Sequence, residues 1–123
     1  MFINPAHSEV NDTFTVRNIS VDVTSNSSFV ARDLAINQGM RVAFQTLLKR
    51  LTIEADYERL PDMSDEKIES FLIGFEVEEE KLSNVRYIGS LTFRFKDSPI
   101  RDLLTMNDLN FSESLAKPFL VIP

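Results

Sequence analysis

The chain contains no cysteine, no tryptophan and only one histidine among its 123 residues. Without cysteine these residues form no disulfide bond and hold no thiolate metal site or cysteine nucleophile, although many exported bacterial domains also do without cysteine. The one histidine, His7, has no second histidine with which to build a metal cluster, and it lies in a stretch expected to be flexible. We therefore expect no metal site and no catalytic residue.

Other functional signals are also missing. Every apolar run is shorter than the roughly 18 residues of a membrane-spanning helix. No Gly-rich phosphate loop, G-x-S-x-G or S-x-x-K motif occurs, which removes the usual anchors for nucleotide cofactors and serine nucleophiles. The formal net charge is −6 and the 13 Lys and Arg are scattered, which disfavours phosphate backbones. We predict no cofactor, no nucleic-acid partner and no direct membrane insertion of the domain.

What is present is the composition of one folded domain. Hydrophobic residues make up 43% and charged residues 26%, and ten phenylalanines supply core material. A chain of this length buries roughly two-thirds of its unfolded surface on folding. We expect a single α/β domain over residues 12–123. Because the apolar run 118–123 stops abruptly, we expect this domain to be the N-terminal part of a longer chain.

Residues 1–11 have two interpretations. Ala6-His7-Ser8 is a small-x-small triplet of the kind that precedes a signal-peptidase cleavage point, here before Glu9. The apolar stretch ahead of it is too short for the hydrophobic region of a signal. The residues are therefore either the tail of an export signal whose start lies upstream, or the flexible terminus of a cytoplasmic protein.

An alternating strand and a long helix fill the first part of the domain. In the strand at 12–24 the apolar residues change phase near Arg17-Asn18, which predicts a β-bulge. Polar residues 24–28 predict a helix N-cap, and the apolar period predicts a helix over 28–51. Gly39 in its middle predicts close approach to a strand. The side chains expected to face inward are Leu34, Ile36, Met40, Ala43, Phe44, Leu47, Leu48 and Leu51.

The remaining elements complete a two-layer arrangement. They are a short helix capped by Ser64 and running through Leu72, a hairpin over 73–96 that turns near 82–84, a helix opened by Ser98-Pro99, and a last strand at 118–123. Gly74 and Gly89 within the hairpin predict close approach of neighbouring elements. The predicted order is β-α-α-β-β-α-β, an α/β (α+β) sandwich with helices on one face of a mixed four-stranded sheet.

The two hairpin strands carry opposite charges on their predicted outward face. The acidic run 76–80 invites a metal-binding interpretation, but strand alternation spreads its carboxylates, so cross-strand ion pairs on a solvated face are favoured. We regard this face as a possible interaction surface. Its residues are Glu76, Glu78, Glu80, Arg86, Arg94 and Lys96.

The segment Phe93-Arg94-Phe95-Lys96 resembles the aromatic platform of RNA-binding sheets, on which bases stack. However, alternation sends Phe93 and Phe95 to the same face as Leu91, which the helices should cover. Core packing is the favoured interpretation.

Taken together, the ordered segments resemble the bacterial domain of unknown function 2066. The resemblance extends over about residues 14–123. In its first half it rests on the opening strand and on the helix segment Ala31-Arg32-Asp33-Leu34-Ala35-Ile36, which leads to Gly39, Ala43-Phe44 and Leu47-Leu48-Lys49-Arg50-Leu51-Thr52. In its second half it rests on Gly74-Phe75-Glu76-Val77-Glu78-Glu79-Glu80, on the strand from Arg86-Tyr87 to Phe95, and on Pro118-Phe119-Leu120-Val121-Ile122-Pro123. It implies bacterial origin, an upstream export signal, a longer parent chain and no assigned activity. It supplies no catalytic residues.

The leading functional hypothesis is a non-catalytic module of the periplasm or cell envelope. It would bind an envelope protein, not identified by the sequence, through a strand edge or the charged face, as polypeptide-transport-associated domains with a similar opening arrangement do by strand addition. The alternative is the substrate-binding part of an enzyme whose catalytic residues lie beyond Pro123. A third hypothesis, cytoplasmic nucleic-acid binding, predicts salt-sensitive binding to oligonucleotides. The oligomeric state stays open.

Overall fold

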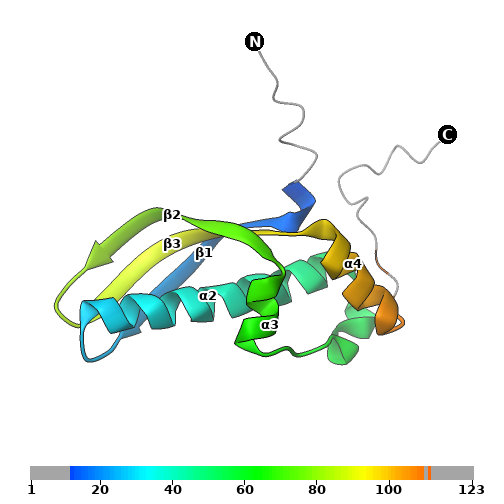
Figure 1. The fold of residues 1–123 in the computed structure, drawn as a ribbon, viewed down its shortest axis with the longest axis horizontal. Helices are drawn as coiled ribbons and strands as arrows, with labels where there is room; N and C mark the ends of the chain where they lie inside the picture. Colours follow the sequence, from blue (N-terminus) through cyan, green and yellow to red (C-terminus); the bar gives the residue numbers. More distant parts are fainter. Residues whose placement is uncertain (1–11, 110, 112–123) are drawn as a thin grey trace, which may run out of the picture.

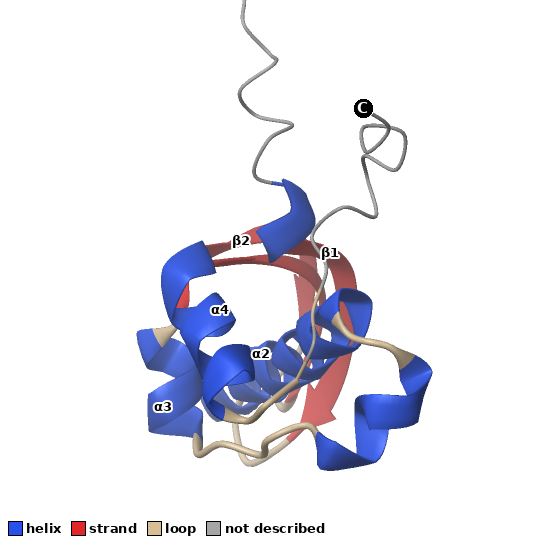
Figure 2. Cartoon of the chain, turned by 90° about the vertical axis from the view of Figure 1, so that its right-hand side faces the viewer, coloured by secondary structure: helices blue, strands red, loops and turns tan. Residues whose placement is uncertain are grey.

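A computed structural model of the protein describes residues 12–109 and Phe111 (Figure 1). Their elements, in chain order, are η1 (Asp12–Phe14), β1 (Thr15–Thr24), α2 (Ser28–Leu51), η2 (Glu54–Arg59), α3 (Asp65–Ser70), β2 (Leu72–Leu82), β3 (Arg86–Phe95) and α4 (Asp97–Met106). The α+β class is confirmed. The helices α2, α3 and α4 lie together on one side of the sheet (Figure 2).

Within the described residues the sheet has three strands in the order β1-β3-β2, and both pairings are antiparallel. The predicted mixed four-stranded sheet is therefore not found there. The fourth strand of that prediction, residues 118–123, lies outside the described residues. Both β1 and β2 are edge strands of the sheet as described.

The bulge predicted in β1 is confirmed. The pairing of β1 with β3 shifts between Val16 and Ile19, and Asn18 adopts φ 59°, a left-handed conformation that asparagine tolerates. The extra residues restore one continuous apolar face, because Val16, Ile19 and Val21 are all buried.

The helix α2 begins and ends where the sequence predicts. The Ser27 hydroxyl accepts a hydrogen bond from the Val30 amide at 3.1 Å, which caps the first turn. A Cβ on Gly39 would lie 3.1 Å from Val21 Cγ1 and 3.2 Å from Leu91 Cδ1, so the predicted close approach to the sheet is also confirmed. The prediction that Leu34 faces inward is wrong, because its side chain is 48% exposed.

Small residues take the place expected for Leu34. Ala31 and Ala35 are fully buried against the sheet, on the same side of α2 as Gly39. Since the helix axis comes this close to β1 and β3, alanine and glycine fit at the contact and leucine does not. The remaining inward residues predicted for the helix are buried or partly buried.

The elements α3, η2 and α4 lie at the end of the domain where α2 ends. Ser64 caps α3 as predicted, and the Phe71 ring after α3 stacks on Phe44 of α2, with ring centroids 5.8 Å apart. Residues 54–59 form a short 3-10 helix that the sequence did not predict. The helix α4 begins at Asp97, slightly before the predicted Ser98-Pro99 start.

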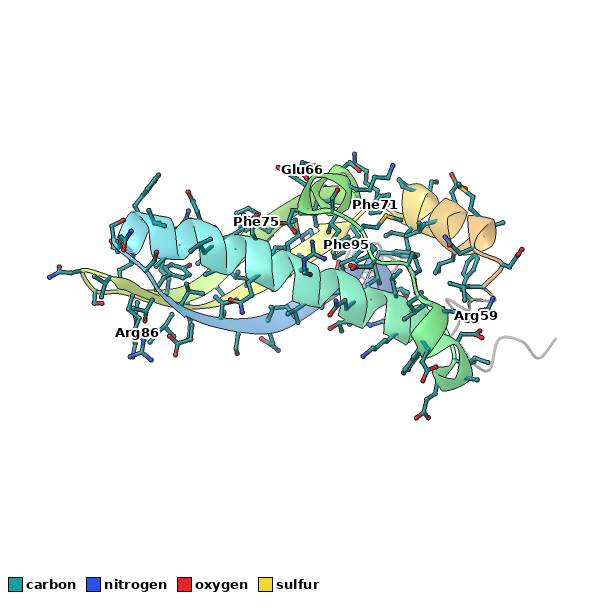
Figure 3. The ribbon with its side chains drawn as sticks, turned by 90° about the horizontal axis from the view of Figure 1, so that it is seen from below. Arg59, Glu66, Phe71, Phe75, Arg86 and Phe95 are labelled. Carbon is teal, nitrogen blue, oxygen red and sulfur yellow. The ribbon has the colours of Figure 1, made fainter. Side chains whose placement is uncertain are left out.

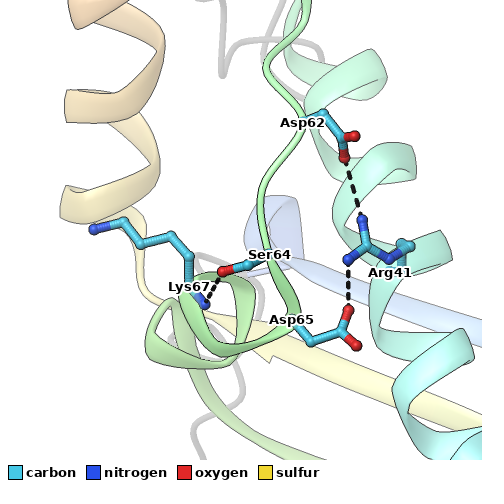
Figure 4. A network of polar contacts seen from close by, with 5 residues as sticks. All are labelled: Arg41, Asp62, Ser64, Asp65 and Lys67. Atoms are coloured by element: carbon cyan, nitrogen blue, oxygen red, sulfur yellow. Dashed lines mark hydrogen bonds and ion pairs between the residues drawn. The ribbon is translucent and has the colours of Figure 1, made fainter.

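One arginine ties α3 and its leading loop to α2. The Arg41 guanidinium forms ion pairs with Asp62 at 3.2 Å and with Asp65 at 2.5 Å (Figure 4). The bond to Asp65, followed by the nearby charge of both carboxylates, raises the pKa of Arg41. The contact joins the loop before α3 and the first turn of α3 to α2.

Candidate functional site

Two of the six predicted interaction residues meet as expected on the outer face of the sheet, the face turned away from α2. Arg94 Nη2 of β3 lies 3.1 Å from Glu76 Oε2 of β2. Next to them, Thr92 donates a hydrogen bond to the Glu78 carboxylate at 3.0 Å. The outer side of the hairpin is thus polar and internally bonded, as the alternation predicts.

Arg86 also lies on the outer face, but its partner is on the other neighbouring strand. Its guanidinium donates two hydrogen bonds, of 2.8 and 2.7 Å, to the Asp22 carboxylate of β1. This bidentate pair holds the pKa of Asp22 below its usual range, against the smaller effect of desolvation. The expected pairing of Arg86 with a glutamate of β2 is wrong.

The prediction that Glu80 shares this outer face is wrong as well. The pairing of β2 with β3 shifts between Val77 and Glu79, so a bulge at Glu78 reverses the alternation for the rest of β2. The Glu80 carboxylate therefore turns to the helix side. There it accepts a hydrogen bond from the Tyr87 hydroxyl at 2.7 Å and lies 3.7 Å from Arg32 Nε of α2.

Tyr87 is held protonated by these surroundings. Its side chain is fully buried, and desolvation, together with the hydrogen bond to Glu80 and the charge of Glu80, raises the pKa of Tyr87 to about 12. A Cβ on Gly89 would lie 3.0 Å from the Tyr87 ring, so the predicted crowding at Gly89 is confirmed. At Gly74 it is wrong, because nothing lies within 4 Å of a Cβ there.

Lys96 is the second residue, after Glu80, that does not join the predicted surface. It follows β3 and precedes α4, and its ammonium group donates to the Ser70 carbonyl at the end of α3. Of the six predicted residues, four share the outer face. They are Glu76, Glu78, Arg86 and Arg94.

The outer face also carries a shallow, open depression of about 920 Å³. Ser20 and Ser90 are opposed in the pairing of β1 with β3, and their small side chains leave room beside Ile88. The charged residues of the lining are Asp22, Glu79, Glu80 and Lys81, and of these Glu80 turns its carboxylate to the helix side. Apart from the short η1 before β1, no helix lies on this face over the described residues (Figure 2).

Sequence reasoning missed a second surface, on the helix side of β2. The residues of β3 on this side, Tyr87 and Phe93, are completely buried, whereas their partners on β2, Leu82 and Phe75, are 51% and 40% exposed. Val77, opposite buried Leu91, is only partly buried. We refer to the three β2 residues Phe75, Val77 and Leu82 as the open row.

The open row exists because of where α2 lies. The helix packs against β1 and β3 and not along β2 (Figure 3). A helix about 10 Å wide covers roughly two strands spaced about 4.8 Å apart, so a third strand is left at its flank. Phe75 rests against the buried Phe93 ring, with centroids 5.8 Å apart, and is accessible from the other side.

Within residues 12–109 and Phe111, no three His, Cys, Asp or Glu side chains are grouped so as to hold a metal ion. Phe93 and Phe95 are buried, which confirms core packing over the RNA-platform interpretation. No helix in the part of the chain that the structure describes is long and apolar enough to cross a membrane.

Over the residues that the structure describes, these features define the class: a small α+β domain with a three-stranded antiparallel sheet, a polar sheet face that α2, α3 and α4 leave uncovered, and an incompletely covered edge strand. Comparison of the chain with protein-family models, with curated proteins and with solved structures finds no match in any of the three.

Proposed function

We propose that this domain is a non-catalytic, protein-binding or assembly module of a bacterial cell envelope, and that it binds its partner by strand addition to β2. The observation that carries the proposal is the open row on an edge strand. Strand addition uses backbone hydrogen bonds at the edge and apolar contacts on alternate side chains. β2 offers both over 11 residues.

We further propose that residues 118–123 add a fourth strand beside β1, which makes the sheet mixed and leaves β2 as the binding edge. Arg59 Nη2 holds the Asp108 carbonyl at 3.2 Å, and Arg50 Nη1 bonds the Thr13 and Thr15 carbonyls at the start of β1. Both contacts lie at the C-terminal end of α2.

The α2 flank beside β1 supports this placement. Arg32 lies on the flank of α2 that faces β2, because it contacts Glu80. Leu34 comes two residues later, about 200° around the helix, and therefore lies on the opposite flank. Its side chain is 48% exposed, so an apolar strand beside β1 would bury it.

The envelope location rests on Ala6-His7-Ser8 and on the resemblance to the bacterial domain of unknown function 2066. The intact mass of the mature full-length protein from its native host tests it. A chain that begins at Glu9 supports export to the periplasm, and a chain that retains Met1 contradicts it and favours the cytoplasm.

Site-specific photo-crosslinking in the native host tests the binding edge. A photoreactive residue at the exposed Glu79 position on β2 should give an adduct with one envelope protein, and the same residue at the exposed Glu58 position on η2 should not. The adduct should disappear with Phe75→Glu. Equal adducts from both positions, or none from position 79, would contradict strand addition at β2.

A second candidate is the substrate-binding part of an enzyme whose catalytic residues lie beyond Pro123. The depression on the outer face favours it, because its serine and charged lining could hold a polar ligand. A His, Cys or acidic cluster in the sequence that follows Pro123, together with loss of turnover in Ser90→Leu, would support this function over the first.

A further inference from the structure

We infer that the segment added to β2 is extended, apolar at alternate positions and basic at the positions between them. This inference rests on the proposed strand addition and names the chemistry of the partner. It follows from the two different faces that β2 presents at its free edge.

On the helix side, the partner would meet the apolar side chains of the open row and, between Val77 and Leu82, Glu80, whose carboxylate is held by Tyr87 and Arg32. Phe75 and Leu82 of the open row are 40% and 51% exposed, and Phe29 on α2 is 73% exposed. Phe29 lies one turn before Arg32, on the flank of α2 that faces β2. An added strand therefore needs apolar side chains at every second position, which would cover the open row.

On the outer side, the partner would meet carboxylates. The outward residues of β2 include Glu76, Glu78 and Glu79, with Lys81 as the one cation. Glu76 is paired with Arg94 and Glu78 is bonded to Thr92, whereas Glu79 is exposed and no contact of its carboxylate is seen among the described residues. Opposite charges across neighbouring strands attract and like charges repel, so lysine or arginine is favoured at the outward positions.

The same charges disfavour two other occupants. Two copies of this domain joined through β2 would bring their acidic runs together, which costs free energy. The chain's own segment Phe119–Ile122 has four consecutive apolar residues and no cation to place beside Glu79. A basic, alternating partner satisfies both faces.

Titration of the full chain with short capped peptides tests the inference, with backbone amide NMR as the readout. The probes are three Lys-Val repeats, three Glu-Val repeats, and the Lys-Val peptide with its central valine replaced by proline. We expect the Lys-Val peptide to shift the amides of β2 and to bind at least about fivefold more tightly than the other two peptides.

Two matched variants locate the contact. Glu79→Lys should weaken Lys-Val binding about fivefold and improve Glu-Val binding, whereas Glu58→Lys, with the same charge change on η2, should alter neither. Phe75→Ala should weaken both peptides, and Leu34→Ala, at similar exposure on the opposite flank, should not. Thermal unfolding of each variant establishes that it is folded.

The outcomes separate the two proposals. Equal binding of the Lys-Val and Glu-Val peptides at β2 would overturn the inferred basic partner and leave strand addition standing. Binding that Glu58→Lys weakens as much as Glu79→Lys would place the contact elsewhere and overturn the inference. If no peptide shifts the β2 amides, both the inference and strand addition at β2 fail.

Discussion

Replacing Gly89 with alanine tests the packing of Tyr87, the side chain that bonds Glu80 on the helix side of the sheet. The added Cβ would lie 3.0 Å from both Tyr87 Cε2 and the Tyr87 hydroxyl, and 3.2 Å from the backbone oxygen of Glu79. Tyr87 is fully buried and the Glu79 oxygen belongs to the neighbouring strand, so neither moves freely. The substitution must therefore shift the ring and strain its 2.7 Å hydrogen bond to Glu80.

The expected magnitude follows from opposing effects. Overpacking a filled site costs about 1–3 kcal/mol, and a lost hydrogen bond about 0.5–1.5 kcal/mol. Alanine regains about 0.5–1 kcal/mol over glycine in a strand interior. We expect Gly89→Ala to lower the free energy of unfolding by about 1–3 kcal/mol.

Gly74→Ala is the matched control, because it makes the same change in the neighbouring strand. Nothing lies within 4 Å of its added Cβ, so only the gain of about 0.5–1 kcal/mol applies. Urea unfolding followed by circular dichroism measures both, through midpoints compared at an unchanged m-value. If the two substitutions change stability by the same amount, or Gly89→Ala stabilises, the Tyr87 ring does not pack as the structure places it.

Three further predictions concern single side chains. Because folding raises the pKa of Tyr87 from 10.0 to about 12, the free energy of unfolding should fall as pH rises through this interval. Urea midpoints should show a smaller fall in Tyr87→Phe than in Tyr57→Phe. Because the pKa of Asp22 is lowered, its contribution is present above its ordinary value of 3.8 and lost below it, so Asp22→Asn should flatten the acid limb of the same titration. Ser27→Ala should lower Tm by removing about 1 kcal/mol of capping, whereas Ser28→Ala should have little effect.

The sequence predicts one bulge and not the other, and the reason lies in side-chain chemistry. In β1 the apolar residues change from even to odd positions around Arg17-Asn18, so the slip is visible in the pattern. In β2 the bulge falls within three consecutive glutamates, residues 78–80, and moving one glutamate to the other face leaves the pattern unchanged. Glu80 could therefore not be placed from the sequence.

In α2, hydrophobicity alone predicts the wrong inward residue. Hydrophobicity alone favours Leu34 over Ala31 for an inward position, yet Ala31 is fully buried and Leu34 is half exposed. The information was present in Gly39, whose close approach to a strand was predicted. A helix that approaches closely at one point requires small residues at the neighbouring turns on the same face, and Ala31 and Ala35 satisfy this condition.

The surface proposed for binding follows from strand order, which alternation does not encode. Phe75 and Val77 have the same inward pattern as Leu91 and Phe93, and in the sequence nothing separates the covered residues from the open ones. The order β1-β3-β2 places β3 in the middle, so α2, which packs beneath β1 and β3, leaves the apolar side of β2 at its flank. One long helix covers about two strands, so the apolar side of the third strand is left partly exposed. Since the same strand is also an unpaired edge of the described sheet, a single added strand would satisfy both its backbone and its open row.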